Sequence, residues 1–173
     1  MKRMLCLLFA LLLCLSVAGC GSKEQPAAMD VEAEASAIME KYALSSGNRY
    51  SSLSQNEGEY LSEELIRAYY GDAAEMPDFG SVEAYAVYID ESMPLLPCEF
   101  GIFKMKEGAD TELFMAFLQA RIDLKILNAQ AYPTTDTEPL TTAKLGSKGS
   151  YVWYCAVKGG NDDIHKTLTE KAG

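Results

Sequence analysis

Val82–Asp90 (VEAYAVYID) and Cys98–Met105 (CEFGIFKM) are the stretches of sequence that decide the fold. Both are rich in β-branched and aromatic residues, which favour strands. The connection between them, Glu91–Pro97, contains Pro94 and Pro97, which are unsuited to a central strand, and it is short enough to join an antiparallel pair. The sequence therefore predicts a β-hairpin near the centre of the chain.

The longest helix is predicted directly after this hairpin. Asp110 can cap it, and Thr111–Asn128 places leucine, isoleucine and phenylalanine side chains along one broad face. We place Arg121, Asp123 and Lys125 on the opposite, solvent-facing side. The helix is therefore expected to pack on the sheet through its apolar face.

A second hairpin is predicted beyond this helix. Leu140–Leu145 and Ser150–Val157 flank a glycine-bearing turn at Gly146–Gly149. The turn has a superficial likeness to a phosphate-binding loop, but it lacks the spacing and the following helix of such a loop. The interpretation as a hairpin is the better one.

Shorter helices are predicted at Asp30–Leu44, Ser62–Tyr70 and Asp162–Lys171, whereas Arg49–Tyr60 is ambiguous. Strand pairs that are joined locally and separated by helices indicate an α+β fold. We expect an antiparallel sheet of about four strands, formed by the two hairpins, with helices packed mainly on one face. Residues 30–173 would make up this single domain.

The first residues of the chain have the pattern of a bacterial lipoprotein leader. Lys2 and Arg3 precede a short apolar run, and the small residues Ala18 and Gly19 stand directly before Cys20. The run is shorter than the roughly 20 apolar residues of a membrane-spanning helix, although an uncleaved signal anchor is the alternative. We expect residues 1–19 to be removed and Cys20 to carry a lipid.

The residues that follow Cys20 are small and polar and include a proline, so residues 20–29 are expected to form a flexible tether. Two or more lipid chains hold a protein stably on a bilayer, where one chain is marginal. The sequence therefore predicts a domain anchored on the extracytoplasmic face of the cell membrane. The membrane, through the N-terminal lipid, is its first expected partner.

The chain is acidic. Its formal net charge is −10 at pH 7, and it becomes −12 if Lys2 and Arg3 leave with the leader. No cluster of basic residues remains that could follow a phosphate backbone, so nucleic acid is not an expected partner. No cofactor-binding motif is recognised, and no cofactor is expected.

Two cysteines, Cys98 and Cys155, remain after the leader and the anchor are set aside, and both lie in predicted strands. An exported compartment permits a disulfide between them. The alternative is two buried, reduced thiols that act as small hydrophobic side chains. His165 is the single histidine, and without CxxC or HxxxH spacing neither a metal site nor a catalytic histidine is expected.

Aromatic residues are concentrated on the predicted strands. If helices cover only one face of the sheet, an exposed aromatic strip on the other face could stack on sugars or hold a peptide. The alternative is ordinary packing in the core. The candidate surface comprises Tyr85, Tyr88, Tyr151, Trp153 and Tyr154.

Several short stretches have a familiar pattern and order. They are Ala68-Tyr69-Tyr70-Gly71, Glu99-Phe100-Gly101-Ile102-Phe103-Lys104, the helix with Arg121, Tyr132-Pro133 and Gly149-Ser150-Tyr151-Val152. Over about residues 30–165 the chain resembles the DUF4358 family of uncharacterised bacterial lipoproteins. The resemblance implies a Gram-positive envelope, but it carries over no activity and no functional residues.

No arrangement of residues in the sequence is typical of a known catalytic site. We therefore expect a non-enzymatic envelope protein that binds another envelope protein or a wall component. The alternative is an envelope hydrolase or an enzyme-inhibitor module. A deep pocket with convergent polar groups would favour an enzyme, and a flat aromatic face would favour binding.

Overall fold

The computed structural model describes residues 28–71, 76–92 and 97–173. Within them, a five-stranded antiparallel sheet has the order β1-β2-β3-β5-β4. Its strands are β1 (Asn48–Ser51), β2 (Val82–Asp90), β3 (Cys98–Met105), β4 (Lys144–Lys148) and β5 (Tyr151–Ala156). The predicted central hairpin is present, with Tyr88 opposite Phe100. The α+β fold class is therefore confirmed.

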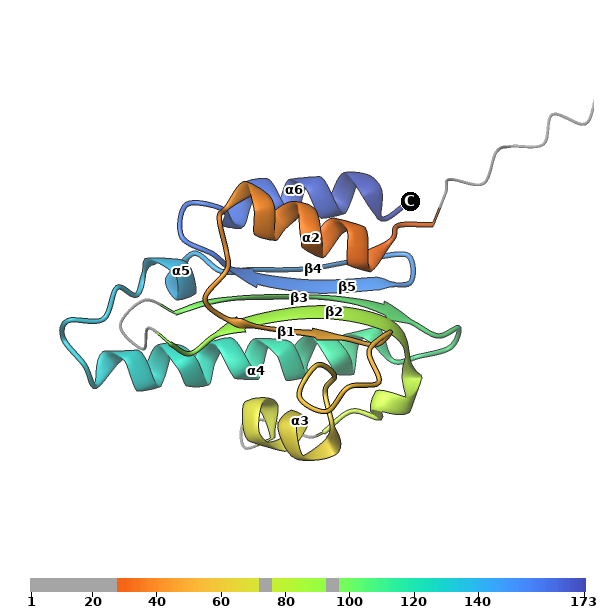
Figure 1. Ribbon diagram of the computed structural model, residues 1–173, viewed down its shortest axis with the longest axis horizontal. Coiled ribbons are helices and arrows are strands. Elements are labelled where there is room, and N and C mark those ends of the chain that lie inside the picture. The colour runs from red at the N-terminus through yellow and green to blue at the C-terminus, as the bar shows by residue number, and fades with distance from the viewer. Residues whose placement is uncertain (1–27, 72–75, 93–96) are drawn as a thin grey trace, which may run out of the picture.

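Helices cover both faces of the sheet (Figure 1). The helices α2 (Val31–Lys41) and α6 (Asn161–Lys171) lie on one face, and α4 (Thr111–Gln130) lies on the other with α3 (Glu63–Tyr70) beyond it. The short α5 (Glu138–Thr141) leads into β4, and a 3-10 turn at Phe79–Ser81 precedes β2. The expectation of helices mainly on one face is wrong.

Two hydrophobic cores explain this three-layer arrangement. Between the sheet and α4, the core is rich in aromatic side chains such as Phe103, Phe114 and Phe117. Between the sheet and the α2–α6 layer, it includes Ile102, Trp153 and Leu168. Every residue of β5 is buried, which is the burial of a strand covered on both sides. The additional strand, β1, lies mostly within Arg49–Tyr60, the segment whose structure the sequence left ambiguous.

Local sequence signals set the helix starts. Asp30, Ser62 and Asp110 each accept hydrogen bonds from backbone N–H groups in the first turn of the following helix. These bonds satisfy donors that have no partner within the helix.

The second hairpin turns later than expected. Gly146 lies inside β4, and the turn comes at Gly149, which has a φ of 59°. A Cβ atom on Gly146 would lie 2.5 Å from the indole Cζ2 of Trp153. The glycine therefore lets the indole ring lie over the edge strand, which is a different role from the one that was predicted for it.

The described chain begins and ends at the same end of the sheet (Figure 1). There the hydroxyl of Tyr151, at the start of β5, donates to the carbonyl of Met29 at 3.0 Å. Lys171 in α6 pairs with Glu34 in α2 at 2.6 Å. The end of β2, the start of β3 and the C-terminal end of α2 lie at the opposite end. Within the residues described, we find no helix with the length and apolar character needed to cross a bilayer.

Candidate functional site

A pocket of about 210 Å³ opens at this opposite end of the sheet. It lies on the face that α2 and α6 cover, where β2 ends and β3 begins. The loop after α2 forms one wall, and the residues that follow β5 form another. Its lining comprises Tyr42, Ala43, Leu44, Ser46, Tyr88, Asp90, Cys98, Val157 and Lys158. We refer to it as the end pocket.

Asp90 is the acidic residue of the end pocket, and only 8% of its surface is exposed. Its carboxylate accepts hydrogen bonds from the Ser46 hydroxyl and from the backbone N–H of Ser92 at 2.9 Å. The Ser92 hydroxyl donates a further bond at 2.5 Å. Burial alone would raise the pKa of Asp90, but these hydrogen bonds outweigh it and hold the pKa below its ordinary value. Asp90 is therefore ionised at neutral pH.

The turn after α2 brings the first wall into place. The N–H of Leu44 donates to the carbonyl of Met39 at 2.9 Å, which is the bond of a Schellman helix end. Ala43 sits at the left-handed position of this motif with a φ of 53°, where glycine is the usual residue. It is the one non-glycine residue with positive φ in the part of the chain that the structure describes. The wall of the pocket is therefore a strained turn.

Gly47 is required by the close approach of this turn to β2. Its N–H donates to the hydroxyl of Tyr88 at 2.9 Å. A Cβ atom at this position would lie 2.6 Å from the carbonyl oxygen of Ile89 and 2.7 Å from the ring of Tyr88. Only glycine allows the loop to lie this close to the strand.

Tyr42 and Lys158 lie at the rim of the end pocket, and each is bound to a residue outside the pocket. The Tyr42 hydroxyl donates to Asp163 at 2.8 Å, and burial together with this carboxylate raises its pKa to about 12. The Lys158 ammonium pairs with Asp136 at 2.6 Å. The positive charge at the rim is thereby neutralised.

Cys98 and Cys155 are both free, so the disulfide that the sequence allowed is not formed. The strand register explains this, because Cys155 pairs with Phe100 and Cys98 lies two residues before Phe100 in β3. Such a diagonal offset separates the two Cα atoms more widely than direct pairing does. Burial raises the pKa of each thiol to about 12. The Cys98 thiol in the end pocket is therefore protonated at neutral pH.

A buried ion pair lies at the same end of the sheet on the opposite face. Glu99 accepts two hydrogen bonds from Arg121, from Nε at 2.7 Å and from a terminal nitrogen at 2.6 Å. Lys125 adds a second positive partner at 3.1 Å. Burial alone would raise the pKa of Glu99, but the two cations outweigh it and lower the pKa. Glu99 therefore stays ionised at neutral pH although its side chain is fully buried.

Tyrosines enclose this pair. Arg121 also donates to the carbonyl of Tyr69, and its guanidinium carbon lies 4.8 Å from the ring centre of Tyr70. The Tyr70 hydroxyl is 3.0 Å from that of Tyr154, and burial raises the pKa of Tyr70 to about 12. A guanidinium over an aromatic ring gains cation–π attraction. The cluster is well satisfied within itself.

Sequence reasoning missed this cluster and placed Arg121 on the wet side of its helix, which is wrong because the residue is only 3% exposed. The error came from treating every charged residue as solvent-facing. One signal pointed the other way, because Glu99 lies within a largely apolar strand.

The predicted aromatic binding strip is not exposed. Helices on both faces bury Tyr88, Tyr151, Trp153 and Tyr154 to 5% exposure or less, and Tyr85 is half-buried. The Tyr85 hydroxyl accepts from the N–H of Leu61 at 2.8 Å. Four of the five side chains are therefore core residues, and the prediction of a binding surface on them is wrong. Tyr88 alone also lines the end pocket.

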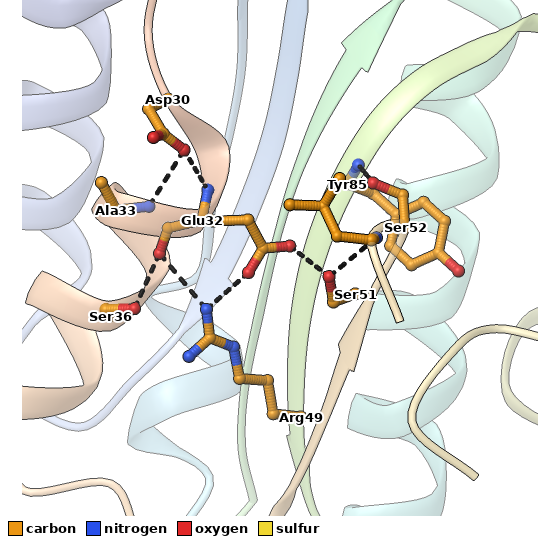
Figure 2. A network of polar contacts seen from close by, with 9 residues as sticks. Asp30, Glu32, Ala33, Ser36, Arg49, Ser51, Ser52 and Tyr85 are labelled. Carbon is orange, nitrogen blue, oxygen red and sulfur yellow. Dashed lines mark hydrogen bonds and ion pairs between the residues drawn. The ribbon is translucent and has the colours of Figure 1, made fainter. Parts of the chain in front are cut away.

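A polar network ties the start of α2 to the edge strand β1 (Figure 2). Glu32 pairs with Arg49 at 2.5 Å and accepts from the Ser51 hydroxyl at 2.5 Å. Arg49 also donates to the carbonyl of Glu32 at 3.3 Å. This network holds the first helix on the sheet and belongs to the scaffold.

His165 also belongs to the scaffold. Its Nδ1 accepts from the indole N–H of Trp153 at 3.3 Å. It does not contribute to the end pocket. Among the described residues, no group of three or more histidine, cysteine or acidic side chains is placed to hold a metal ion.

Cys20 and the leader, residues 1–19, lie outside the described residues, as does most of the predicted tether. Comparison with models of known protein families, with characterised proteins and with solved structures finds no match to the chain.

Chemically, the end pocket offers an ionised carboxylate, hydroxyl groups and aromatic rings around a small space. These are groups that hold a ligand by charge and hydrogen bonds. The thiol that they surround is protonated, and the thiolate is the nucleophilic form of cysteine. The arrangement is thus better suited to binding than to covalent chemistry.

Proposed function

We propose that the chain is a lipid-anchored envelope protein that binds an envelope component through the end pocket. Cys20 carries the lipid, residues 20–29 act as the tether, and the folded domain lies on the extracytoplasmic face of the membrane. The observation that carries this proposal is the position of the pocket, at the end of the sheet away from the point where the chain enters the fold.

The length of β5 gives the distance between the point where the chain enters the fold and the pocket. Tyr151, at the start of the strand, binds the carbonyl of Met29, whereas Val157, just after its end, lines the pocket. Six residues of strand separate the two positions by about 20 Å. A chain from Cys20 to Met29 reaches at most about 30 Å. An anchor at Cys20 would keep the entry point of the chain within about 30 Å of the bilayer, and the pocket lies at the other end of the sheet.

Binding is favoured over hydrolysis by the state of the polar groups. The low pKa of Asp90 keeps it ionised, so it is poorly suited to donate a proton as a general acid. Cys98 is protonated, with a pKa of about 12, so it is not a ready nucleophile. The resemblance to DUF4358 lipoproteins supports the membrane location, in a Gram-positive envelope.

Anchoring is tested with the wild-type chain and the Cys20→Ala variant in a Gram-positive host that is fed labelled palmitate. The wild type should carry the label and sediment with membranes. The Cys20→Ala variant should remain uncleaved and unlabelled. An unlabelled, soluble wild-type chain would refute the anchor.

Binding through the pocket is tested by placing a photo-crosslinking amino acid at Lys158, on the pocket rim, in intact cells. The same group at Lys171, at the other end of the domain, is the matched control. A discrete adduct with an envelope component should form from position 158 and not from position 171. Equal adducts from both positions, or none from 158, would count against the pocket.

A further inference from the structure

We propose that the end pocket binds a small organic primary ammonium group, with Asp90 as its counter-ion. This inference rests on the proposed binding role of the same pocket and adds the chemical class of the ligand. It is drawn from the charge balance, the aromatic lining and the size of the pocket.

The charge balance comes first. The buried charged side chains of the described residues are Asp90, Glu99 and Arg121. Glu99 and Arg121 neutralise each other. Asp90 has hydroxyl and backbone donors only, and the described part of the chain gives it no cationic partner.

The surrounding sequence does not supply the missing cation. Residues 93–96, in the connection that follows Asp90, read Met-Pro-Leu-Leu and contain no charged side chain. Lys158, the cationic residue of the pocket lining, is paired with Asp136 at 2.6 Å. Among the residues that the structure describes, the Asp90 carboxylate therefore has hydrogen-bond donors but no cationic partner. Hydrogen bonds stabilise the ionised carboxylate, and a cationic ligand would add a charge-assisted partner to it.

The other lining groups favour an organic cation over a metal ion. Calcium takes six to eight oxygen ligands, generally with several carboxylates, and magnesium also requires a near-octahedral oxygen shell. The pocket lining offers one carboxylate. Its lining also includes Tyr42 and Tyr88, and aromatic rings attract ammonium groups through cation–π interactions, as the Lys41 ammonium 5.7 Å from the Tyr42 ring centre shows. An ammonium group needs only one carboxylate and a few acceptors.

The size of the pocket limits the ligand. Its volume of about 210 Å³ corresponds to roughly seven water molecules at about 30 Å³ each. A group of four to seven non-hydrogen atoms fits, which is the size of an aminoalkyl head or an aminoacyl ester. Such groups occur as ethanolamine headgroups and as alanyl esters. The shared feature is the primary ammonium.

The test measures binding by saturation-transfer NMR with the full chain in detergent micelles. Ethanolamine is the probe, and ethylene glycol is the neutral control of nearly equal size and shape. We expect a dissociation constant on the order of 1 mM for ethanolamine and at least about tenfold weaker binding of ethylene glycol. Equal binding of the two probes would overturn the proposal without recourse to any variant.

Two variants locate the site. Asp90→Asn should weaken ethanolamine binding by about tenfold or more, whereas Asp123→Asn, which removes the same charge from the exposed face of α4, should leave it unchanged. Near-UV circular dichroism of the single tryptophan, Trp153, checks the fold of both. If Asp90→Asn does not fold, the comparison of ethanolamine with ethylene glycol decides. Undiminished binding by a folded Asp90→Asn variant would refute the proposal.

A further probe distinguishes the sources of the ammonium group. Alanine methyl ester is compared with ethanolamine, and the tighter of the two distinguishes an aminoacyl ester from an aminoalkyl head. This inference and the proposed function can fail separately. A specific adduct at Lys158 in cells, together with no preference for ammonium over its neutral control, would keep the binding role and reject the ligand class.

Discussion

Replacing Arg121 with methionine should destabilise the domain strongly. It should also reverse the way in which ionisation of Glu99 affects the stability of the domain. The substitution removes two hydrogen bonds to Glu99, of 2.7 and 2.6 Å, and the donor to the Tyr69 carbonyl. Lys125, at 3.1 Å, stays as the remaining cation beside Glu99. Breaking a buried pair by removing one partner costs about 3–5 kcal/mol. We expect a loss of that size at pH 7.

The sign of the pH effect follows from the pKa of Glu99. In the wild type the two cations lower this pKa, so the carboxylate contributes stability that is present above its unfolded pKa of about 4.3. That contribution is lost as the pH falls through the lower, folded value. In Arg121→Met, burial becomes the dominant influence and raises the folded pKa above the unfolded one. The deficit relative to the wild type should therefore shrink between pH 7 and pH 4.

The assay is urea unfolding, followed by Trp153 fluorescence, of the wild type and variants at pH 7, 5.5 and 4. Arg67→Met is the matched control, because Arg67 makes a similar pair with Glu63 on an exposed helix surface and its loss should cost under about 1 kcal/mol. The double variant Glu99→Gln with Arg121→Met should recover part of the loss. A deficit below about 1 kcal/mol at pH 7, or one that does not change with pH, would refute the reasoning.

Three further outcomes are expected from the end pocket and its thiols. Gly47→Ala should destabilise the domain by about 2 kcal/mol or more in urea unfolding, since its Cβ would lie 2.6 Å from the Ile89 carbonyl oxygen; an unchanged midpoint would show that the loop can move away. Ala43→Gly should stabilise by about 0.5–1 kcal/mol because it relieves a φ of 53°, and a lower melting temperature would contradict the Schellman assignment. Without reductant, Ellman's reagent at pH 8 should react slowly with the native protein, since burial raises the pKa values of Cys98 and Cys155 to about 12. After unfolding, the reagent should react with both thiols, because both are free. If neither thiol reacts after unfolding, they are paired in a disulfide.

Much of the fold could be predicted because its elements carry local signals. The central hairpin and the long helix capped by Asp110 follow from residue type and spacing. The strand β1 was missed because its four residues, Asn48–Ser51, have one apolar anchor, Tyr50. Its place at the sheet edge depends on pairing with β2, which is not encoded in its own composition.

The sequence contained a signal for helices on both faces of the sheet, but this signal was misread. Tyr151–Ala156 is apolar or aromatic at every position, without the polar alternation of a strand that faces water on one side. That pattern predicts a strand covered on both faces. Treating its tyrosines and tryptophan as an exposed strip followed from assuming one helical layer, and the buried cores correct both errors together.

The end pocket itself could not have been predicted from the sequence. Its residues come from the loop after α2, the end of β2, the start of β3 and the residues after β5. Neither the burial of Asp90 nor its lack of a cationic partner among the described residues can be inferred from its neighbours in the chain. The strained Ala43 likewise becomes visible only in the backbone angles.

The end pocket and the buried ion pair are linked by the geometry of one strand. Cys98 and Glu99 are consecutive in β3, so their side chains point to opposite faces; Cys98 lines the pocket, and Glu99 holds Arg121. The ion pair thereby connects α4 to the strand end that forms the pocket floor. A folded Arg121→Met variant should therefore bind ethanolamine more weakly, although Arg121 does not line the pocket. The matched Arg67→Met variant should bind as the wild type does. Unchanged ethanolamine binding in folded Arg121→Met would show that the two faces of the strand are independent.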